Sequence, residues 1–201
     1  NRVHEQDGQG VYSGAEGDLW ELVMGQQIHI GGLASSLDLA ERAEIGADMQ
    51  GVDLCCCNGA GMRFLLRFRN VARMVGVDFC DKVIAQGERR MREEGLADRA
   101  EFVQADVCAT GLADGDFDFI WGEDAWCYVP DKAALIAEAA RLVRPGGTIA
   151  FTDWVEGPGG LSDDEAERFM AFMKFPSLAT GEDYAGLLED NGCEVRVAED
   201  T

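Results

Sequence analysis

The sequence is short of basic residues, and this shortage excludes two classes of partner. Only 17 lysines and arginines stand against 38 acidic residues, so the formal net charge is −21. A surface of this sign repels the phosphates of nucleic acids and of anionic membranes. The sequence also lacks a secretory signal and any apolar run of about 18 residues, the length that crosses a bilayer. We therefore predict a cytoplasmic protein without nucleic-acid or membrane partners.

Cysteines at metal-ligand spacing are also lacking. Cys55, Cys56 and Cys57 are consecutive, and the other four cysteines stand alone. Consecutive cysteines do not present thiolates at the spacing of a metal site. An odd total of seven cysteines suits a reducing cytoplasm. We predict free thiols and no bound metal.

Length and composition indicate one domain. The chain has 201 residues, of which 47% are hydrophobic, enough for one sizeable core and too few for two. Residues 1–17 are polar and rich in glycine, so we predict a mobile arm there and a single domain over 18–201. Because the chain ends just after a strand-like segment, we expect the domain to be incomplete at its C-terminal end.

Strand-like and helical segments alternate along most of the chain. Short apolar runs bounded by polar turns predict strands, and apolar residues with a helical period predict the segments between them. This alternation is typical of an α/β fold with a doubly wound, mostly parallel Rossmann-like sheet. The predicted strands are 51–56, 73–78, 100–104, 117–122, 148–153 and 193–198. The predicted helices are 61–69, 81–94, 131–142 and 182–191, with helices near 19–23 and at 35–45 as an N-terminal cover.

The alternation pauses between 156 and 179 for an inserted helix. Its start, from Ser162 to Glu165, has the form of a capping box. Its body is apolar on nearly every side, so the helix needs a cover. Three alternatives remain open: a lid over the site, a contact between the subunits of a homodimer, or ordinary packing on the sheet.

Acidic residues stand at successive strand ends, where open parallel sheets bind their ligands. Asp78 ends the second strand, Asp106 follows the third, and Glu123 follows the fourth. Asp78 lies 25 positions after Asp53, an offset at which an acidic side chain accepts hydrogen bonds from ribose hydroxyls. Taken singly, Asp78 could be a solvated turn residue and Asp106 a helix cap. Together they predict a nucleoside site.

The first turn, GVDLCCCNGAG from Gly51 to Gly61, is unsuited to a dinucleotide. A pyrophosphate needs glycines here for close backbone approach, but Cys55 and Cys57 occupy two of those places. Asp53 and Asp78 would add negative charge beside the phosphates. A cationic ligand without phosphate suits the turn better, and S-adenosylmethionine, a nucleoside with a sulfonium, is such a ligand.

The chain resembles the class I S-adenosylmethionine-dependent methyltransferases from about Trp20 to Val197. VDLCCCNGAG stands where that family has D-x-G-x-G-x-G, VGVD ends in the residue that matches its ribose-binding acid, and QADV carries the match to its adenine contact. DGDFDFIW and RLVRPGGTIAFTD resemble its fourth-strand motif and its turn into the fifth strand. The resemblance implies S-adenosylmethionine as cofactor. It assigns to the cofactor Asp53, Cys55, Cys57, Asn58, Gly59, Asp78, Phe79, Ala105, Asp106, Val107 and Glu123.

A finer resemblance concerns the methyl acceptor. WELVMGQQIHIGG is similar to the W-G-x-x-I-H-x-G segment of small-molecule methyltransferases, and DFIWGEDAWCYVPDK is most similar to the sarcosine/dimethylglycine N-methyltransferase type. This implies transfer to the nitrogen of a small amine or amino acid by a monomer or homodimer. Two alternatives remain: an O- or C-methyltransferase of a phenolic, quinol or sugar acceptor, and a non-catalytic binding protein that has kept the fold.

Methyl transfer from a sulfonium is an in-line displacement, so the protein must align the reactants in a dry pocket, and a general base is optional. Of the two histidines, only His29 lies near the predicted pocket. We expect it to orient a carboxylate of the substrate or cofactor, the alternative being a structural role. Tyr128 stands where many relatives carry histidine.

Aromatic residues are expected to face the acceptor. Trp126, Tyr128 and Trp154 are predicted to form a wall that stabilises a developing positive charge through cation–π contacts. A phenolic acceptor would instead need a base, for which Glu123, Asp124 and His29 are candidates. The residues expected to act on the acceptor are His29, Glu123, Trp126 and Tyr128.

Overall fold

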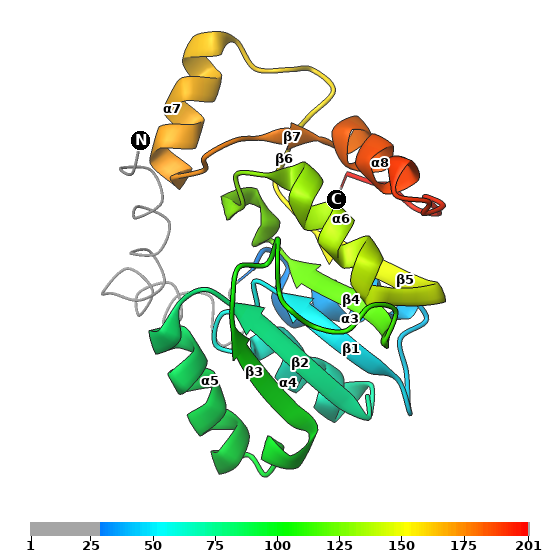
Figure 1. Ribbon diagram of the computed structural model, residues 1–201. Coiled ribbons are helices and arrows are strands. Elements are labelled where there is room, and N and C mark those ends of the chain that lie inside the picture. The colour runs from blue at the N-terminus through cyan, green and yellow to red at the C-terminus, as the bar shows by residue number, and fades with distance from the viewer. Residues whose placement is uncertain (1–28, 201) are drawn as a thin grey trace.

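The computed structural model describes residues 29–200 and shows a five-stranded sheet between two layers of helices (Figure 1). The strand order is β3-β2-β1-β4-β5, and every neighbouring pair is parallel. The order therefore reverses between β1 and β4, the position where sheets of this kind bind ligands. This confirms the predicted fold class. The strands are β1 (Gln50–Leu54), β2 (Arg73–Asp78), β3 (Ala100–Gln104), β4 (Phe117–Glu123) and β5 (Val143–Thr152).

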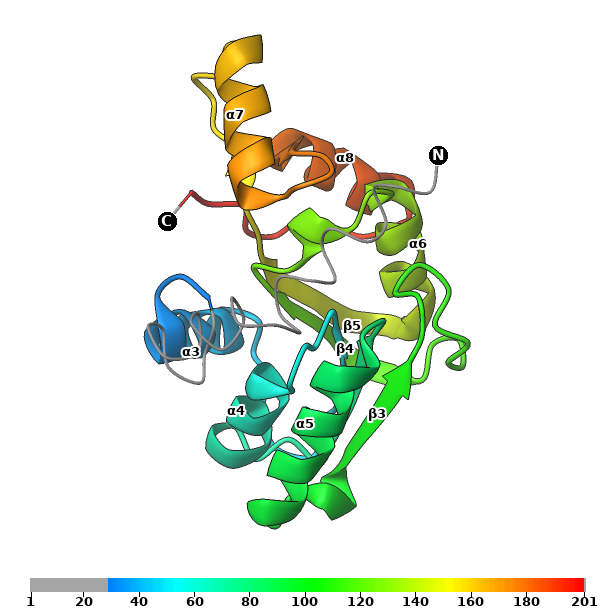
Figure 2. The ribbon, with the colours of Figure 1, turned by 90° about the vertical axis from the view of Figure 1, so that its left-hand side faces the viewer.

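Helices cover both faces of the sheet (Figure 2). Three of them pack over a core that includes Met62 and Phe119, and two pack over a core that includes Val52 and Leu54. Because side chains alternate along a strand, Asp53 points away from the face of Val52 and Leu54. The first set of helices is α3 (Gly32–Arg42), α4 (Ala60–Phe68) and α5 (Asp81–Glu93); the second is α6 (Lys132–Leu142) and α8 (Gly181–Asp190).

The predicted alternation is confirmed, with two exceptions. β5 begins at Val143 rather than at 148, because Val143 already pairs with Phe117 across an irregularity in the register. Residues 193–198 do not form the predicted strand. A strand needs a neighbour for its backbone hydrogen bonds, and no strand among residues 29–200 pairs with this segment. The helix predicted near 19–23 and the arm at 1–17 lie outside the described residues.

The insertion between β5 and α8 contains α7 (Asp163–Met173) and a short ribbon of β6 (Val155–Glu156) and β7 (Ala179–Thr180). The predicted capping box is present, since Glu165 Oε2 accepts hydrogen bonds from the Ser162 backbone N–H at 3.0 Å and the Ser162 hydroxyl at 2.6 Å. No residue of α7 is fully buried, and the helix stands away from the sheet layers (Figure 1). Packing on the sheet is therefore not its role, whereas a lid and a subunit contact stay predictions.

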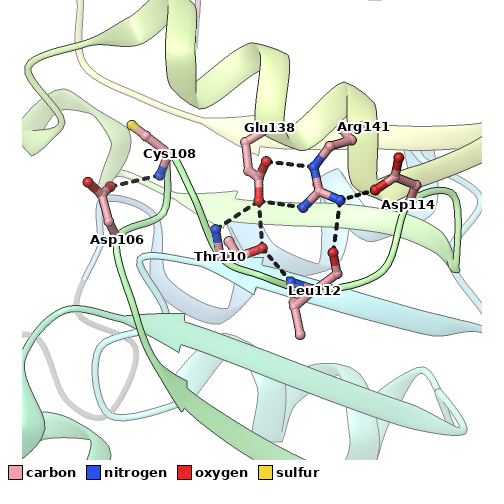
Figure 3. A network of polar contacts seen from close by, with 7 residues as sticks. All are labelled: Asp106, Cys108, Thr110, Leu112, Asp114, Glu138 and Arg141. Atoms are coloured by element: carbon pink, nitrogen blue, oxygen red, sulfur yellow. Dashed lines mark hydrogen bonds and ion pairs between the residues drawn. The ribbon is translucent and has the colours of Figure 1, made fainter.

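A buried charge network fixes the connection between β3 and β4 onto α6 (Figure 3). Glu138 accepts hydrogen bonds from the backbone and hydroxyl of Thr110 at 2.8 and 2.6 Å. Arg141 donates to both oxygens of Glu138 at 2.8 and 2.7 Å, and also to Leu112 O at 2.8 Å. The hydrogen bonds from Arg141 hold the pKa of Glu138 at about 2, below its ordinary value. The network thereby sets the course of the loop that starts with Asp106.

Residues 29–200 contain neither a candidate membrane-spanning helix nor a candidate metal-ligand cluster. Among residues 29–200, no helix has the length and apolar character needed to cross a membrane. Within the same range, no three His, Cys, Asp or Glu side chains are grouped to hold a metal ion. All seven cysteines are free thiols.

Candidate active site

The turn after β1 keeps a glycine-like backbone although it carries cysteines. Cys55 and Cys57 have φ angles of 65° and 49°, and Gly59 has 76°. Side chains in this left-handed region are strained, because Cβ approaches the following carbonyl oxygen. The predicted correspondence of Cys55 and Cys57 with family glycines is thus matched in backbone conformation. The turn ends at Gly59, the N-cap of α4.

We predict that Cys57→Gly stabilises the protein by roughly 0.5–1 kcal/mol, because glycine adopts the positive φ angle without strain. Urea unfolding at fixed pH would measure the free energy of unfolding. The matched control is Cys56→Ala, one position away, where the side chain is buried and no positive φ angle occurs. This control should lose about 1 kcal/mol, and a loss of stability in both variants would contradict the strain at Cys57.

Asp78 joins the turns that follow β1 and β2. Its Oδ2 accepts a hydrogen bond from the Cys57 backbone N–H and its Oδ1 accepts one from the Cys80 N–H, each at 2.9 Å. Burial raises the pKa of Asp78, and the hydrogen bonds from the backbone of Cys80 and Cys57 oppose that rise. The carboxylate keeps further lone pairs, so it can accept from a ligand while it holds both turns.

Asp53 and Glu123 meet at the first turn of α4. A Cβ atom on Gly61 would lie 3.0 Å from Glu123 Oε2 and from Trp121 Nε1, and 3.1 Å from Asp53 Oδ2. Burial raises the pKa of Asp53 well above its usual value, and the charges of Glu123 and Asp78 raise it further. Among residues 29–200, no Lys or Arg pairs with Asp53, Asp78 or Glu123. A cationic ligand would therefore lower the repulsion between these carboxylates.

His29 pairs with Glu123 beneath α3. Its Nε2 lies 3.1 Å from Glu123 Oε1 and 3.0 Å from the Ser36 hydroxyl, and the Ser36 hydroxyl lies 2.6 Å from the same carboxylate oxygen. The second ring nitrogen, Nδ1, lies 3.0 Å from the carbonyl oxygen of Ile30. Both ring nitrogens are thus occupied, and the imidazole is buried. The predicted direct contact with a ligand carboxylate is therefore replaced by a contact with Glu123.

The remaining residues assigned to the cofactor surround the same edge of the sheet. Phe79 is 58% exposed beside Asp78, which leaves its ring free to stack on a base. Asp106 accepts a hydrogen bond from Cys108 N–H at 2.8 Å within a turn, and no helix begins there, so it is not the helix cap considered as an alternative. The other three residues support the strand ends. The Ala105 N–H donates to Asp78 O at 3.1 Å. Val107 lies in the core and Asn58 is buried.

Trp126 is a core residue, which corrects its predicted place in the aromatic wall. Its side chain is fully buried, its ring stacks on Phe151 at 4.2 Å, and its Nε1–H donates to Leu54 O at 3.1 Å. A Cβ on Gly122 would lie 2.3 Å from the indole nitrogen, so the glycine makes room for the ring. The sequence did not show that this tryptophan is buried, because a tryptophan that follows a strand end can be either buried or exposed.

Tyr128 and Trp154 meet through an aromatic residue of the insertion. The ring centroid of Phe175 lies 5.1 Å from that of Tyr128 and 6.2 Å from that of Trp154. The ring centroids of Phe169 and Trp154 are 6.1 Å apart. Tyr128 follows β4 and Trp154 follows β5. The insertion therefore completes an aromatic group, formed by Tyr128, Trp154, Phe169 and Phe175, beyond the carboxyl ends of the central strands.

Two site residues were not found from the sequence. Ser36 is completely buried against Glu123. The sequence could have indicated it, because a polar residue one helical turn before the buried Ala40 lies on the inner side of α3. Thr152 is the register partner of Glu123, and its buried hydroxyl has no hydrogen-bond partner among residues 29–200. An unpaired buried hydroxyl costs about 1–3 kcal/mol, so it is available to a ligand or water.

Comparison with known proteins assigns the family. The family model described as a methyltransferase domain matches residues 52–151, which contain β2, β3 and β4 and most of β1 and β5. The chain belongs to the class I methyltransferases. The predicted family is therefore confirmed, and the cofactor of this family is S-adenosylmethionine.

Relatives of the methyltransferase act on different atoms. This chain is 32% identical over 161 residues to the methyltransferase GfsG of Streptomyces halstedii, and the match covers 78% of this chain and 57% of that protein. It is 27% identical over 184 residues to phosphoethanolamine N-methyltransferase 1 of Triticum aestivum, covering 90% of this chain and 36% of that protein. Other relatives are named as tocopherol O- and sterol C-methyltransferases. The chain spans between 31% and 60% of the length of these curated relatives.

Solved structures share the fold of the methyltransferase. A protein described as a sarcosine dimethylglycine methyltransferase from Galdieria sulphuraria has a TM-score of 0.75 at 24% identity, covering 82% of this chain and 63% of that one. Phosphoethanolamine N-methyltransferase 2 of Haemonchus contortus, in complex with S-adenosyl-L-methionine, has a TM-score of 0.78 at 21% identity, covering 95% and 42%.

Proposed function

We propose that this chain transfers a methyl group from S-adenosylmethionine to the nitrogen of a small amine or amino acid. The observation that carries the proposal is the aromatic group of Tyr128, Trp154, Phe169 and Phe175, next to strand ends that hold several buried carboxylates. A nitrogen gains positive charge as it is methylated, and aromatic faces stabilise that charge. The carboxylates favour a positively charged ligand over an anionic one.

The described residues fit the cofactor. Asp53 is a buried carboxylate and Asp78 a partly buried one, and neither has a described basic partner, so they suit a ligand with a sulfonium and an ammonium group. Asp78 would accept hydrogen bonds from the ribose hydroxyls, and Phe79 and Asp106 would flank the adenine. S-adenosylmethionine supplies, when bound, a methyl group activated on its sulfonium. The protein's own contribution is to align the acceptor and exclude water.

A panel of methyl acceptors tests the proposal. Sarcosine, dimethylglycine, phenols and quinols would be incubated with the protein and S-adenosylmethionine, and formation of S-adenosylhomocysteine would be followed. We expect turnover with one or both of the amino acids. Turnover confined to phenols or quinols would refute the nitrogen assignment. Cofactor binding without any turnover across the panel would favour the alternative of a non-catalytic binding protein.

The aromatic group is tested by Trp154→Ala. Loss of one aromatic face should raise the KM of the amine acceptor roughly tenfold and leave the affinity for S-adenosylmethionine unchanged. Phe172→Ala is the matched control, because Phe172 belongs to the same insertion but is 83% exposed. Equal effects of the two substitutions would argue that the insertion, rather than the Trp154 ring, determines acceptor binding.

A further inference from the structure

Three polar atoms, two from the segment around the start of α3 and one from the end of β4, form a closed triangle beside the proposed cofactor site. The triangle joins His29 Nε2, Ser36 Oγ and Glu123 Oε1, with sides of 3.0, 2.6 and 3.1 Å. The His29 and Glu123 side chains are 4% and 7% exposed, and Ser36 is fully buried. The other oxygen of Glu123 accepts from Trp121 Nε1–H at 3.0 Å.

Two arrangements of protons satisfy the triangle equally well. In the first, a neutral Glu123 carboxyl donates to Ser36 Oγ, the Ser36 hydroxyl donates to Nε2, and the neutral imidazole donates from Nδ1 to Ile30 O. In the second, Nε2–H donates to Glu123, the Ser36 hydroxyl also donates to Glu123, and Nδ1–H still donates to Ile30 O. The heavy-atom distances permit both. One proton can therefore lie on either Glu123 or His29, and the triangle keeps two hydrogen bonds in both cases.

The charges around Glu123 decide where that proton lies. Burial raises the pKa of Glu123, and the charge of Asp124, which follows it directly, raises it further, whereas His29 and the hydrogen bonds from Ser36 and Trp121 lower it. The carboxylates of Asp53 and Glu123 also repel each other. Asp124 also holds the His29 segment, because its Oδ2 accepts from Ile30 N–H at 2.9 Å. No Lys or Arg among residues 29–200 pairs with Glu123 or Asp53. Without a cation the site favours a neutral Glu123, and with one it favours the carboxylate.

We propose that His29 is the proton store of Glu123: the proton lies on Glu123 when the site is empty and moves to His29 Nε2 when a cationic cofactor binds. In this step an O–H bond of Glu123 breaks and an N–H bond of His29 forms, so the neutral pair becomes an ion pair. The proposal rests on the placement of the cofactor under "Proposed function". His29 acts through Glu123 and is thus a positioning residue, which makes the charge of the site follow the charge of its ligand.

Nitrogen NMR of histidine tests the proposal directly. The chain has only two histidines, so His4→Gln leaves His29 as the single imidazole. With ¹⁵N-labelled histidine, the empty protein should show one protonated and one unprotonated ring nitrogen. Addition of S-adenosylmethionine, or of sinefungin, which carries an ammonium in place of the sulfonium, should give two protonated nitrogens. S-adenosylhomocysteine, whose sulfur is neutral, should leave the unprotonated signal in place.

Glu123→Gln is the control, since an amide cannot give up the proton; its His29 signals should not change on addition of S-adenosylmethionine. Calorimetry on the same samples measures binding separately from protonation. Binding of S-adenosylmethionine with no change at His29 would overturn the proposal and leave the proposed function standing. An imidazolium already present in the empty protein would overturn it as well. Absence of calorimetric binding would overturn both.

Discussion

Asp78→Ala is expected to weaken binding of S-adenosylmethionine about 100-fold or more. Charge-assisted hydrogen bonds from two ribose hydroxyls are worth roughly 1.5–3 kcal/mol each, and 1.4 kcal/mol corresponds to a factor of ten in affinity. The substitution also releases the backbone N–H groups of Cys57 and Cys80, which the carboxylate holds at 2.9 Å. Isothermal titration calorimetry measures the effect.

The control for this substitution is Asp81→Ala. Asp81 is an exposed acid in the first turn of α5, three positions beyond Asp78, so its removal changes the net charge by the same amount. We expect the affinity of Asp81→Ala to stay within about threefold of the parent, because exposed charges contribute little. If Asp78→Ala also stayed within that range, the ribose assignment would be wrong.

Asp53→Asn is expected to change stability and cofactor affinity in opposite directions. Burial first, and then the charges of Glu123 and Asp78, raise the pKa of Asp53 in the folded protein. A carboxyl whose pKa is higher folded than unfolded contributes stability at acid pH, and this contribution is lost as the pH rises through the folded value. At pH 8 the parent protein therefore bears a cost that the amide does not.

The expected gain for Asp53→Asn is about 2–4 °C in melting temperature at pH 8 without cofactor, the shift that roughly 1 kcal/mol gives in a chain of this size. The gain should be smaller at pH 5, because this cost declines as the pH falls through the raised folded pKa toward the unfolded one. Affinity for S-adenosylmethionine should fall at least about tenfold, since a charge opposite the cation is lost. Melting curves at both pH values, with and without cofactor, measure both effects; a lower melting temperature of Asp53→Asn at pH 8 would contradict the cost of burying the Asp53 carboxylate.

The central strands could be predicted because they are buried on both faces. β2 appears at the predicted residues 73–78 with four consecutive buried residues, since a continuous apolar run bounded by polar turns leaves little freedom of assignment. The edge strand β3 also appears at the predicted residues 100–104, although none of its residues is fully buried. The strand at 193–198 failed for the opposite reason. Its sequence is compatible with a strand, but a strand forms only beside a partner, and a local pattern carries no information about partners.

The site was predictable as a set of strand ends and not as a set of contacts. Asp53, Asp78 and Glu123 reach one edge of the sheet because parallel strands end together. Trp126 and Tyr128 are two positions apart, yet one lies in the core and the other meets the insertion. Ser36 was missed because its role depends on Glu123, which is 87 residues away in sequence. Side-chain direction after a strand end depends on packing that no short sequence window contains.

The environment of the cysteines in the first turn protects them from methylation by the cofactor. A thiolate is a strong nucleophile, and one beside an activated methyl group would accept that methyl and inactivate the protein. Burial, and then the charge of Asp78, raises the pKa of Cys57 to about 12, and burial likewise raises the pKa of Cys55 well above its usual value. Both groups therefore stay as thiols at neutral pH. The carboxylates that attract a cationic methyl donor thus also protect the turn from self-methylation.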